Sequence, residues 1–252
     1  VGQMMGRLTP SEARASGEPQ LVGVEAVQRF ERVVERHAGT LLEDTVTGIT
    51  SADGGFAVQT LHHGAQRSTA VIIATGVTPQ RLEVPEAMRL LEYGLSYSTL
   101  TYARLLSGRR AAVVGATARA LRGAAELAAT ASEVYLILPE TPTLDHRLLD
   151  LLRQRANVTV MEGYQVVALS GGKHVEQIVV ERHGQQQAIA VDAVFAALGL
   201  RPNSQLVSGM VKTDAAGFIW VNDHRGTTLP GIFAAGDVTT AFGEHALIAA
   251  GD

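Results

Sequence analysis

The chain has 252 residues, no cysteine, a formal net charge of −4 and 46 % hydrophobic residues. This composition suits a globular protein with a sizeable core, and at about 150 residues per domain the length predicts one or two domains. The lack of cysteine excludes disulfide frameworks, cysteine-ligated metals and thiol chemistry within the chain. The scattered Lys and Arg argue against nucleic acid as a partner. No apolar run reaches the roughly 18 residues of a membrane span, so we expect a cytoplasmic protein without a membrane partner.

The first part of the chain predicts a loop, a helix and a meander of strands. Residues 1–20 have no periodicity and many turn formers, which is typical of a loop. The segment from Gly23 to His37 has apolar residues at helical spacing and predicts an amphipathic helix. Three short β-like segments follow, and the turn residues between them indicate an antiparallel meander. These segments cover 40–51, 56–63 and 70–76.

The middle of the chain predicts a βαβαβ unit, which implies a parallel sheet. Residues 111–114 form the first expected strand, 115–131 a turn and helix, and 133–138 the second strand. A helix at 144–155 and a strand at 157–162 complete the unit. Two more β-like runs lie at 177–184 and 188–199, and the chain closes with 218–222, 232–238 and a small-residue helix from about Glu244.

Two short apolar strands each end in a turn that contains glycine, VIIATG at 71–76 and GIFAAGDV at 231–238. Open α/β sheets place their ligands at the carboxyl ends of the strands. There Gly236 would allow close backbone approach, and Asp237 would accept hydrogen bonds from sugar or polyol hydroxyls. The alternative interpretation is a strand-ending aspartate that only caps the next helix.

Four segments in this order give the chain a resemblance to low-molecular-weight thioredoxin reductases and their ferredoxin–NADP reductase relatives, which are FAD/NAD(P)-dependent pyridine nucleotide-disulfide oxidoreductases. They are ATG at 74–76, GRRAAVVGATARA at 108–120, ALGLRPNS at 197–204 and GIFAAGDV at 231–238. The resemblance implies an α/β fold with two Rossmann-like three-layer domains and antiparallel β-meander crossovers. It assigns 1–101 and 221–252 to a discontinuous FAD-binding-type domain that is incomplete at its N-terminus, and 102–220 to an NAD(P)-binding-type domain.

The resemblance also implies FAD as the cofactor. The positions that it assigns to the flavin site are Gln3, Thr75, Gly76, Gly236, Asp237, His245 and Ala246. Asp237 would hold the ribityl chain, and the helix start at His245 and Ala246 would face the flavin pyrimidine carbonyl, where N–H dipoles stabilise reduced flavin. Residues 1–40 contain no GxGxxG turn for the FAD pyrophosphate, so we expect that segment upstream of the printed sequence or lost.

The redox-active cysteine pair of the family has no counterpart in this chain. Ser98 and Thr101 stand where the two cysteines of the CxxC motif would be. A hydroxyl cannot take part in thiol–disulfide exchange, which requires a sulfur thiolate. We therefore expect no thioredoxin reductase activity of the usual kind.

The nicotinamide dinucleotide motif is degenerate. Gly115 and Ala120 match the pattern, but Thr117 replaces its middle glycine and puts a β-branched side chain where the pyrophosphate would approach. The alternative is that the Thr117 hydroxyl itself binds a phosphate. Leu138-Pro139-Glu140 replaces the basic run that binds the 2′-phosphate of NADPH, although Glu140 could take the place of an acid for the ribose of NADH. We therefore expect little NADPH use.

Together these features predict an FAD-binding, thioredoxin reductase-like oxidoreductase that lacks the CxxC pair and does not use NADPH. Its electron donor or acceptor would be a protein or a small molecule, and the resemblance implies a homodimer. No catalytic side chain is assigned, and no metal site is expected because the histidines lack metal-ligating spacing. Two alternatives are a non-catalytic binding or regulatory relative and a ferredoxin–NADP reductase-like enzyme, which also lacks the cysteine pair but needs NADP(H).

Overall fold

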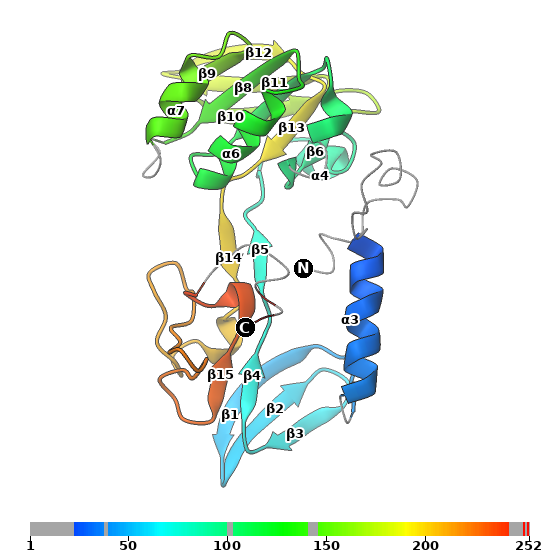
Figure 1. Ribbon diagram of the computed structural model, residues 1–252, viewed down its shortest axis with the longest axis vertical. Coiled ribbons are helices and arrows are strands. Elements are labelled where there is room, and N and C mark those ends of the chain that lie inside the picture. Colours follow the sequence, from blue (N-terminus) through cyan, green and yellow to red (C-terminus); the bar gives the residue numbers. More distant parts are fainter. Residues whose placement is uncertain are drawn as a thin grey trace. The chain divides into compact units, whose positions relative to one another are not determined.

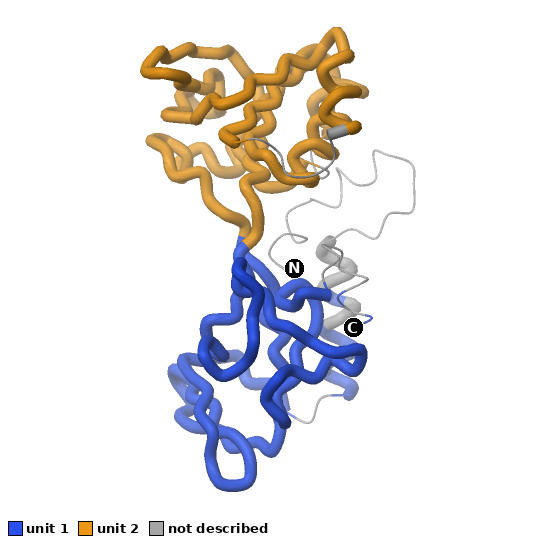
Figure 2. Tube along the Cα trace, turned by 90° about the vertical axis from the view of Figure 1, so that its left-hand side faces the viewer, with its two compact units in different colours: residues 1–78, 201–252 blue, residues 79–200 orange. Residues whose placement is uncertain are grey.

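The computed structural model describes residues 23–37, 40–99, 103–140, 146–241, 249 and 251. The chain divides into two compact units, coloured separately in Figure 2. Unit 1 comprises residues 1–78 and 201–252, and unit 2 comprises residues 79–200. Among the described residues, no helix combines the length and the apolar character that a bilayer crossing requires.

Unit 1 contains helix α3 (Gly23–His37), an antiparallel sheet and a parallel pair of strands (Figure 1). The antiparallel sheet has the order β1 (Val46–Ala52), β2 (Gly55–Thr60), β3 (Gly64–Ser68). The parallel pair is β4 (Val71–Ile73) with β15 (Ile232–Ala234). Unit 1 also contains the short 3₁₀ helices η2 (Gln205–Val207) and η3 (Gly236–Val238). One apolar core joins β1, β2, β4, β15, η2 and η3; its buried members include Ile49, Phe56, Ile73, Ile219 and Ile232.

The predicted strand at 70–76 was placed in the wrong sheet. The third strand of the meander is β3, whereas β4 pairs in parallel with β15, with Ile72 opposite Phe233. Every residue of β3 is exposed, so it lacks the alternation that marks a strand in the sequence. The apolar run of β4 is typical of a strand in a parallel sheet, and its partner lies far away in the sequence.

Unit 2 is a three-layer α/β domain, as predicted. Its parallel sheet has the order β6 (Leu95–Ser96), β13 (Ala193–Ala196), β7 (Arg110–Val114), β8 (Glu133–Leu138), β9 (Val158–Glu162). Helices α6 (Ala118–Leu127) and α7 (His146–Arg153) share one apolar core with this sheet. The other face carries α4 (Ala87–Leu90) and an antiparallel meander of β10 (Gln165–Ser170), β11 (Gln177–Arg182) and β12 (Gln185–Ala190). The 3₁₀ helix η1 (Ala103–Leu106) precedes β7.

The borders between the units differ from those expected at 101/102 and 220/221. Leu90 and Leu95 pack in the core between the parallel sheet and the meander of unit 2. Val207 and Ile219 pack in the core of unit 1. The chain passes between the units through β5 (Val77–Pro79) and β14 (Leu200–Pro202), which pair with each other, and next to them the N–H of Gln80 donates to the carbonyl oxygen of Gly199 at 2.9 Å. The assignment of each unit to a cofactor stays a prediction.

Candidate cofactor site

The parallel pairing of β4 and β15 brings two glycine-containing turns to one sheet edge. Ile73 lies opposite Ala234, and the N–H of Ala235 donates to the carbonyl oxygen of Ile73 at 3.0 Å. Because the strands run in the same direction, their carboxyl ends leave the sheet at the same edge, where open α/β sheets bind ligands. The predicted positions Thr75 and Gly76 therefore lie at the same edge as Gly236 and Asp237.

Asn203 holds the turn after β4. Its backbone N–H donates to the carbonyl oxygen of Gly76 at 2.9 Å, and its side-chain amide donates to the carbonyl oxygen of Thr75 at 2.9 Å. The hydroxyl of Thr75 donates in return to the carbonyl oxygen of Asn203 at 2.6 Å, and that of Thr78 donates to Asn203 Oδ1 at 2.9 Å. The hydroxyl of Thr75 is thus engaged in a hydrogen bond within the protein. The role of Asn203 was not predicted, although the residue belongs to the ALGLRPNS segment of the resemblance.

The turn after β15 requires glycine and buries an acid. Gly236 has φ +72°, and a Cβ there would lie 3.3 Å from Cβ of Ala249. The N–H and the hydroxyl of Thr239 both donate to the carbonyl oxygen of Gly236, at 3.0 and 2.9 Å. Asp237 in η3 is 9 % exposed. These bonds close the turn that carries Asp237 at the end of β15.

The described residues at this edge fit the sugar-like chain of a flavin nucleotide. Gly76 has φ +65°, and a Cβ built on it would meet no atom within 4 Å, so its backbone is open to close approach. The carboxylate of Asp237 is a hydrogen-bond acceptor of the kind that polyol hydroxyls need. Gln3, His245 and Ala246, the other predicted flavin positions, lie outside the described residues.

In unit 2 the turn after β7 closes onto the strand β13. Gly115 has φ +139°, and a Cβ there would come within 2.2 Å of the carbonyl oxygen of Ala197. Only glycine fits at this position without a backbone shift. The N–H of Ala197 donates to the carbonyl oxygen of Val114 at 2.8 Å, which holds the two segments together.

Thr117 caps the helix that a dinucleotide pyrophosphate would use. Its hydroxyl accepts a hydrogen bond from the N–H of Ala120 at 3.1 Å and donates one to the carbonyl oxygen of Ala197 at 2.9 Å. A free N–H at a helix N-terminus is what binds phosphate in such motifs. Because both the hydroxyl and this N–H are engaged within the protein, the observed contacts do not favour the alternative in which Thr117 binds a phosphate.

The described residues at the end of β8, Leu138 to Glu140, include no cation for a 2′-phosphate. Leu138 is fully buried in the core below α6 and α7. The carbonyl oxygen of Pro139 accepts a hydrogen bond from Nε2 of Gln165 at 3.1 Å, and Glu140 is exposed. The residues of the nucleotide motif and of this strand end therefore do not fit NADPH.

The segment at the expected cysteine positions packs against α6. The N–H of Ser98 donates to Oγ of Ser96 at 3.1 Å, and Ser98 is half-buried. Thr99 is 4 % exposed and lies so close to Gly123 that a Cβ there would be 2.5 Å from its hydroxyl oxygen. The guanidinium of Arg119 donates to the carbonyl oxygen of Tyr97 at 2.8 Å. These contacts give the segment a packing role; Thr101 lies outside the described residues.

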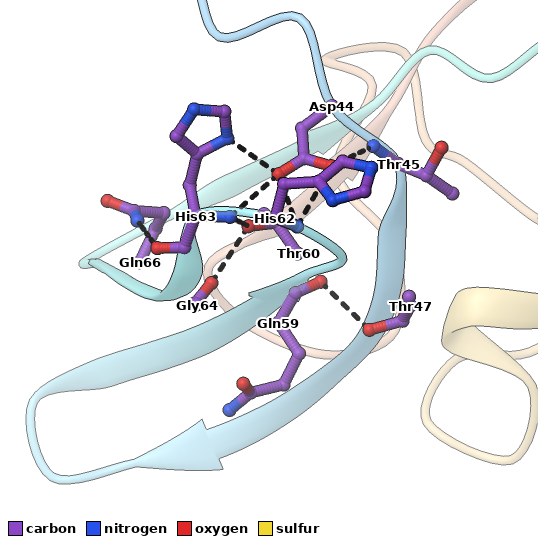
Figure 3. Close-up of polar contacts among 9 residues, drawn as sticks. All are labelled: Asp44, Thr45, Thr47, Gln59, Thr60, His62, His63, Gly64 and Gln66. Carbon is purple, nitrogen blue, oxygen red and sulfur yellow. Dashed lines mark hydrogen bonds and ion pairs between the residues drawn. The ribbon is translucent and has the colours of Figure 1, made fainter.

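A separate polar cluster in unit 1 surrounds Asp44 (Figure 3). Its carboxylate accepts hydrogen bonds from the N–H groups of Thr45, His62 and His63 at 2.7, 3.0 and 3.0 Å, and contacts Nδ1 of His63 at 2.7 Å. Burial raises the pKa of Asp44, but the hydrogen bonds outweigh it and hold this pKa well below its ordinary value. The described residues contain no cluster of three metal-ligating side chains. We interpret the hydrogen bonds of Asp44 as stabilising the turn between β2 and β3.

The sequence matches the family model of the pyridine nucleotide-disulphide oxidoreductases over residues 5–251. The chain belongs to this family. It is 30 % identical over 205 residues to the F subunit of alkyl hydroperoxide reductase from Xanthomonas campestris pv. phaseoli, a match that covers 80 % of this chain and 39 % of that protein. The corresponding protein of Staphylococcus aureus (strain NCTC 8325 / PS 47) is 30 % identical over 216 residues, covering 82 % of this chain and 43 % of that protein.

Solved thioredoxin reductases share the fold of this chain. The enzyme of T. acidophilum superposes with a TM-score of 0.68 at 26 % identity, covering 91 % of this chain and 77 % of that chain. The enzyme of Streptococcus pyogenes MGAS5005 gives a TM-score of 0.74 at 25 % identity, covering 94 % and 78 %. The chain spans about two fifths of the length of the curated relatives above. The predicted family and the predicted pair of Rossmann-like folds are confirmed.

Proposed function

We propose that this protein is an FAD-binding, thioredoxin reductase-like oxidoreductase that transfers electrons without a dithiol relay and without NADPH. The observation that carries the proposal is the shared sheet edge of Gly76, Gly236 and Asp237. Bound FAD supplies an isoalloxazine ring that accepts and releases electrons. Its partner would be a protein or small-molecule electron donor or acceptor.

The residues of this edge divide the work of binding. Asp237 accepts hydrogen bonds from the ribityl hydroxyls, and its burial shields these bonds from competing water. Gly76 and Gly236 allow the backbone to approach the cofactor. Asn203 positions the turn of Thr75 and Gly76 through three hydrogen bonds and does not itself touch the cofactor in this proposal.

The N-terminal cap of α6 argues for an electron donor other than NADPH. Thr117 engages the N–H of Ala120, which is thereby withdrawn from phosphate binding. Leu138 contributes only an apolar side chain to the core at the position of the basic run. Both features argue against the ferredoxin–NADP reductase-like alternative, because such an enzyme needs NADP(H).

The experiment that tests the proposal is the absorption spectrum and mass of the natural full-length protein. We expect a yellow protein with the absorption bands of bound flavin and a mass that includes FAD. A colourless protein that does not bind added FAD would contradict the proposal and favour the non-catalytic binding or regulatory relative. The expected homodimer and cytoplasmic location stay predictions; sedimentation of the same sample measures the former.

A further inference from the structure

Two strands of the meander in unit 2 change from apolar to polar along the face that they turn toward the parallel sheet. In β11 the fully buried Ile178 and Val180 are followed, again two residues on, by Arg182. In β12 the buried Ile189 is preceded by Gln187. Residues two apart in a strand lie on the same face. Arg182 and Gln187 therefore share the strand face of Ile178, Val180 and Ile189, but both are exposed where the apolar core ends.

Strands β8 and β9 of the parallel sheet change in the same way. In β8 Tyr135 precedes Ile137 by two residues, and in β9 Thr159 precedes Met161 by two. Ile137 and Met161 pack in the core between this sheet and the meander. Tyr135 and Thr159 are paired across the two strands. Both layers thus contribute polar side chains where the apolar core ends.

A cavity of about 540 Å³ lies among these polar ends. Small-molecule sites in proteins typically have volumes of about 300–1,000 Å³. Its lining includes Tyr135, Thr159, Met161, Tyr164, Arg182 and Gln187. None of these residues belongs to the turn at 115–120 or to the strand end at 138–140, so the cavity is distinct from the degenerate nucleotide motif.

The cation that lines this cavity is Arg182. The guanidinium of Arg182 lies over the ring of Tyr164 at 5.5 Å from the ring centroid, and no carboxylate in the described part of the chain pairs with it. Glu162, the acid in the lining, forms an ion pair with Arg153. Burial and then Glu133 raise the pKa of Tyr135, so this phenol stays neutral.

We propose that the cavity binds a small aromatic carboxylate or phosphate. The guanidinium of Arg182 holds the anionic group, because its planar fork of N–H donors matches either anion. The ring of the ligand packs against Tyr164, Tyr135 and the side chain of Met161. Gln187, also in the lining, supplies an amide donor. The two anions share the same recognition chemistry, so the test uses one probe of each kind.

The test is a calorimetric titration of the natural full-length protein with 4-hydroxybenzoate, phenyl phosphate, inorganic phosphate and phenol. We expect saturable binding of at least one aromatic anion, with phenol and inorganic phosphate each weaker by about tenfold or more. The tighter aromatic anion identifies the group that the site prefers. Arg182→Gln lowers its affinity about tenfold or more, and Gln187→Leu lowers it by a smaller factor.

The matched control is Arg122→Gln, an exposed arginine on α6, across the parallel sheet from the cavity. It leaves the affinity unchanged. Arg182 is itself exposed, so its substitution retains the fold, which circular dichroism confirms on each variant. The proposal is overturned by no saturable binding of either aromatic anion, by phenol or inorganic phosphate binding equally well, or by an unchanged affinity in Arg182→Gln. Flavin absorbance is independent of these outcomes, so failure here is distinguishable from failure of the proposed function.

Discussion

The hydroxyl of Thr117 donates a hydrogen bond of 2.9 Å to the carbonyl oxygen of Ala197, and so joins the first turn of α6 to the end of β13. The oxygen of the same hydroxyl accepts a bond from the N–H of Ala120. A threonine at this position therefore performs two tasks within the protein. It stabilises the helix end and occupies a donor that a dinucleotide would need.

Replacing Thr117 with alanine is expected to lower the free energy of unfolding of the protein by about 1 kcal/mol, because the helix loses its N-cap. Urea denaturation followed by circular dichroism measures this change. Thr117→Ser keeps the hydroxyl and is expected to lose much less. Ser132→Ala, at an exposed position of the same unit, is the control for a general effect of substitution. Equal stability of Thr117→Ala and the natural protein would show that the cap contributes nothing.

NADPH is expected to cause little flavin reduction in this protein. Neither the capped turn of Thr117 nor the buried Leu138 offers a site for its phosphates. Anaerobic mixing of the flavin-loaded protein with NADPH, followed at the flavin absorption bands, measures the extent of reduction. Dithionite added to the same sample is the control for a reducible flavin. Fast, stoichiometric bleaching by NADPH would refute the expectation.

Asp237→Ala is expected to weaken FAD retention. The substitution removes the acceptor for the ribityl hydroxyls, and loss of hydrogen bonds to a charged group corresponds to roughly 1.5–3 kcal/mol, or about tenfold or more in affinity. The ratio of flavin to protein after gel filtration measures retention. Asp223→Ala, an exposed aspartate of the same unit, is the matched control. If both variants keep full occupancy, the assignment of Asp237 is wrong.

The cluster at Asp44 predicts a pH-dependent contribution to stability. The folded-state pKa of this carboxylate lies below its ordinary value of 3.8, so the unfolded chain takes up the proton first on acidification. The stabilisation is therefore fully present above about pH 5 and is lost as the pH falls through 4 toward the lower folded-state pKa. We expect the stability difference between the natural protein and Asp44→Asn to be constant at neutral pH and to shrink below about pH 4.

Urea denaturation at a series of pH values measures this difference. The control is Asp53→Asn, which changes an exposed aspartate in the turn between β1 and β2 of the same unit. A difference between the natural protein and Asp44→Asn that does not change down to about pH 2.5 would contradict the role of Asp44.

The βαβαβ unit could be predicted from the sequence because its signals are local. The strand at 133–138 coincides with β8, and the helix after Gly115 begins next to the residue that caps it. Apolar runs, glycine turns and helical periodicity are enough to define such elements. The family resemblance then placed Gly76 and Asp237 at one site, and the pairing of β4 with β15 brings their turns together.

The features that were missed depend on contacts between distant residues. The pairing of Ile72 with Phe233 joins the two ends of unit 1, and no local pattern distinguishes it from pairing within the meander. Asn203 forms hydrogen bonds to Thr75 and Gly76, although it lies 128 residues after Thr75 in the sequence. Arg182 is exposed, yet it shares a strand face with the buried Ile178 and Val180 and lines a cavity with residues of β8 and β9. Such placements follow from tertiary packing, which the sequence does not display locally.

The hydrogen bond between Gln80 and Gly199 marks a point at which a domain could be removed from the chain or inserted into it. Both crossings between the units occur where β5 and β14 pair, so residues 79–200 start and finish at neighbouring points. Deletion of residues 79–200 would leave two chain ends that a short turn could join. Another domain could equally be inserted at the same point, so the pair β5 and β14 is a suitable site for recombination between domains.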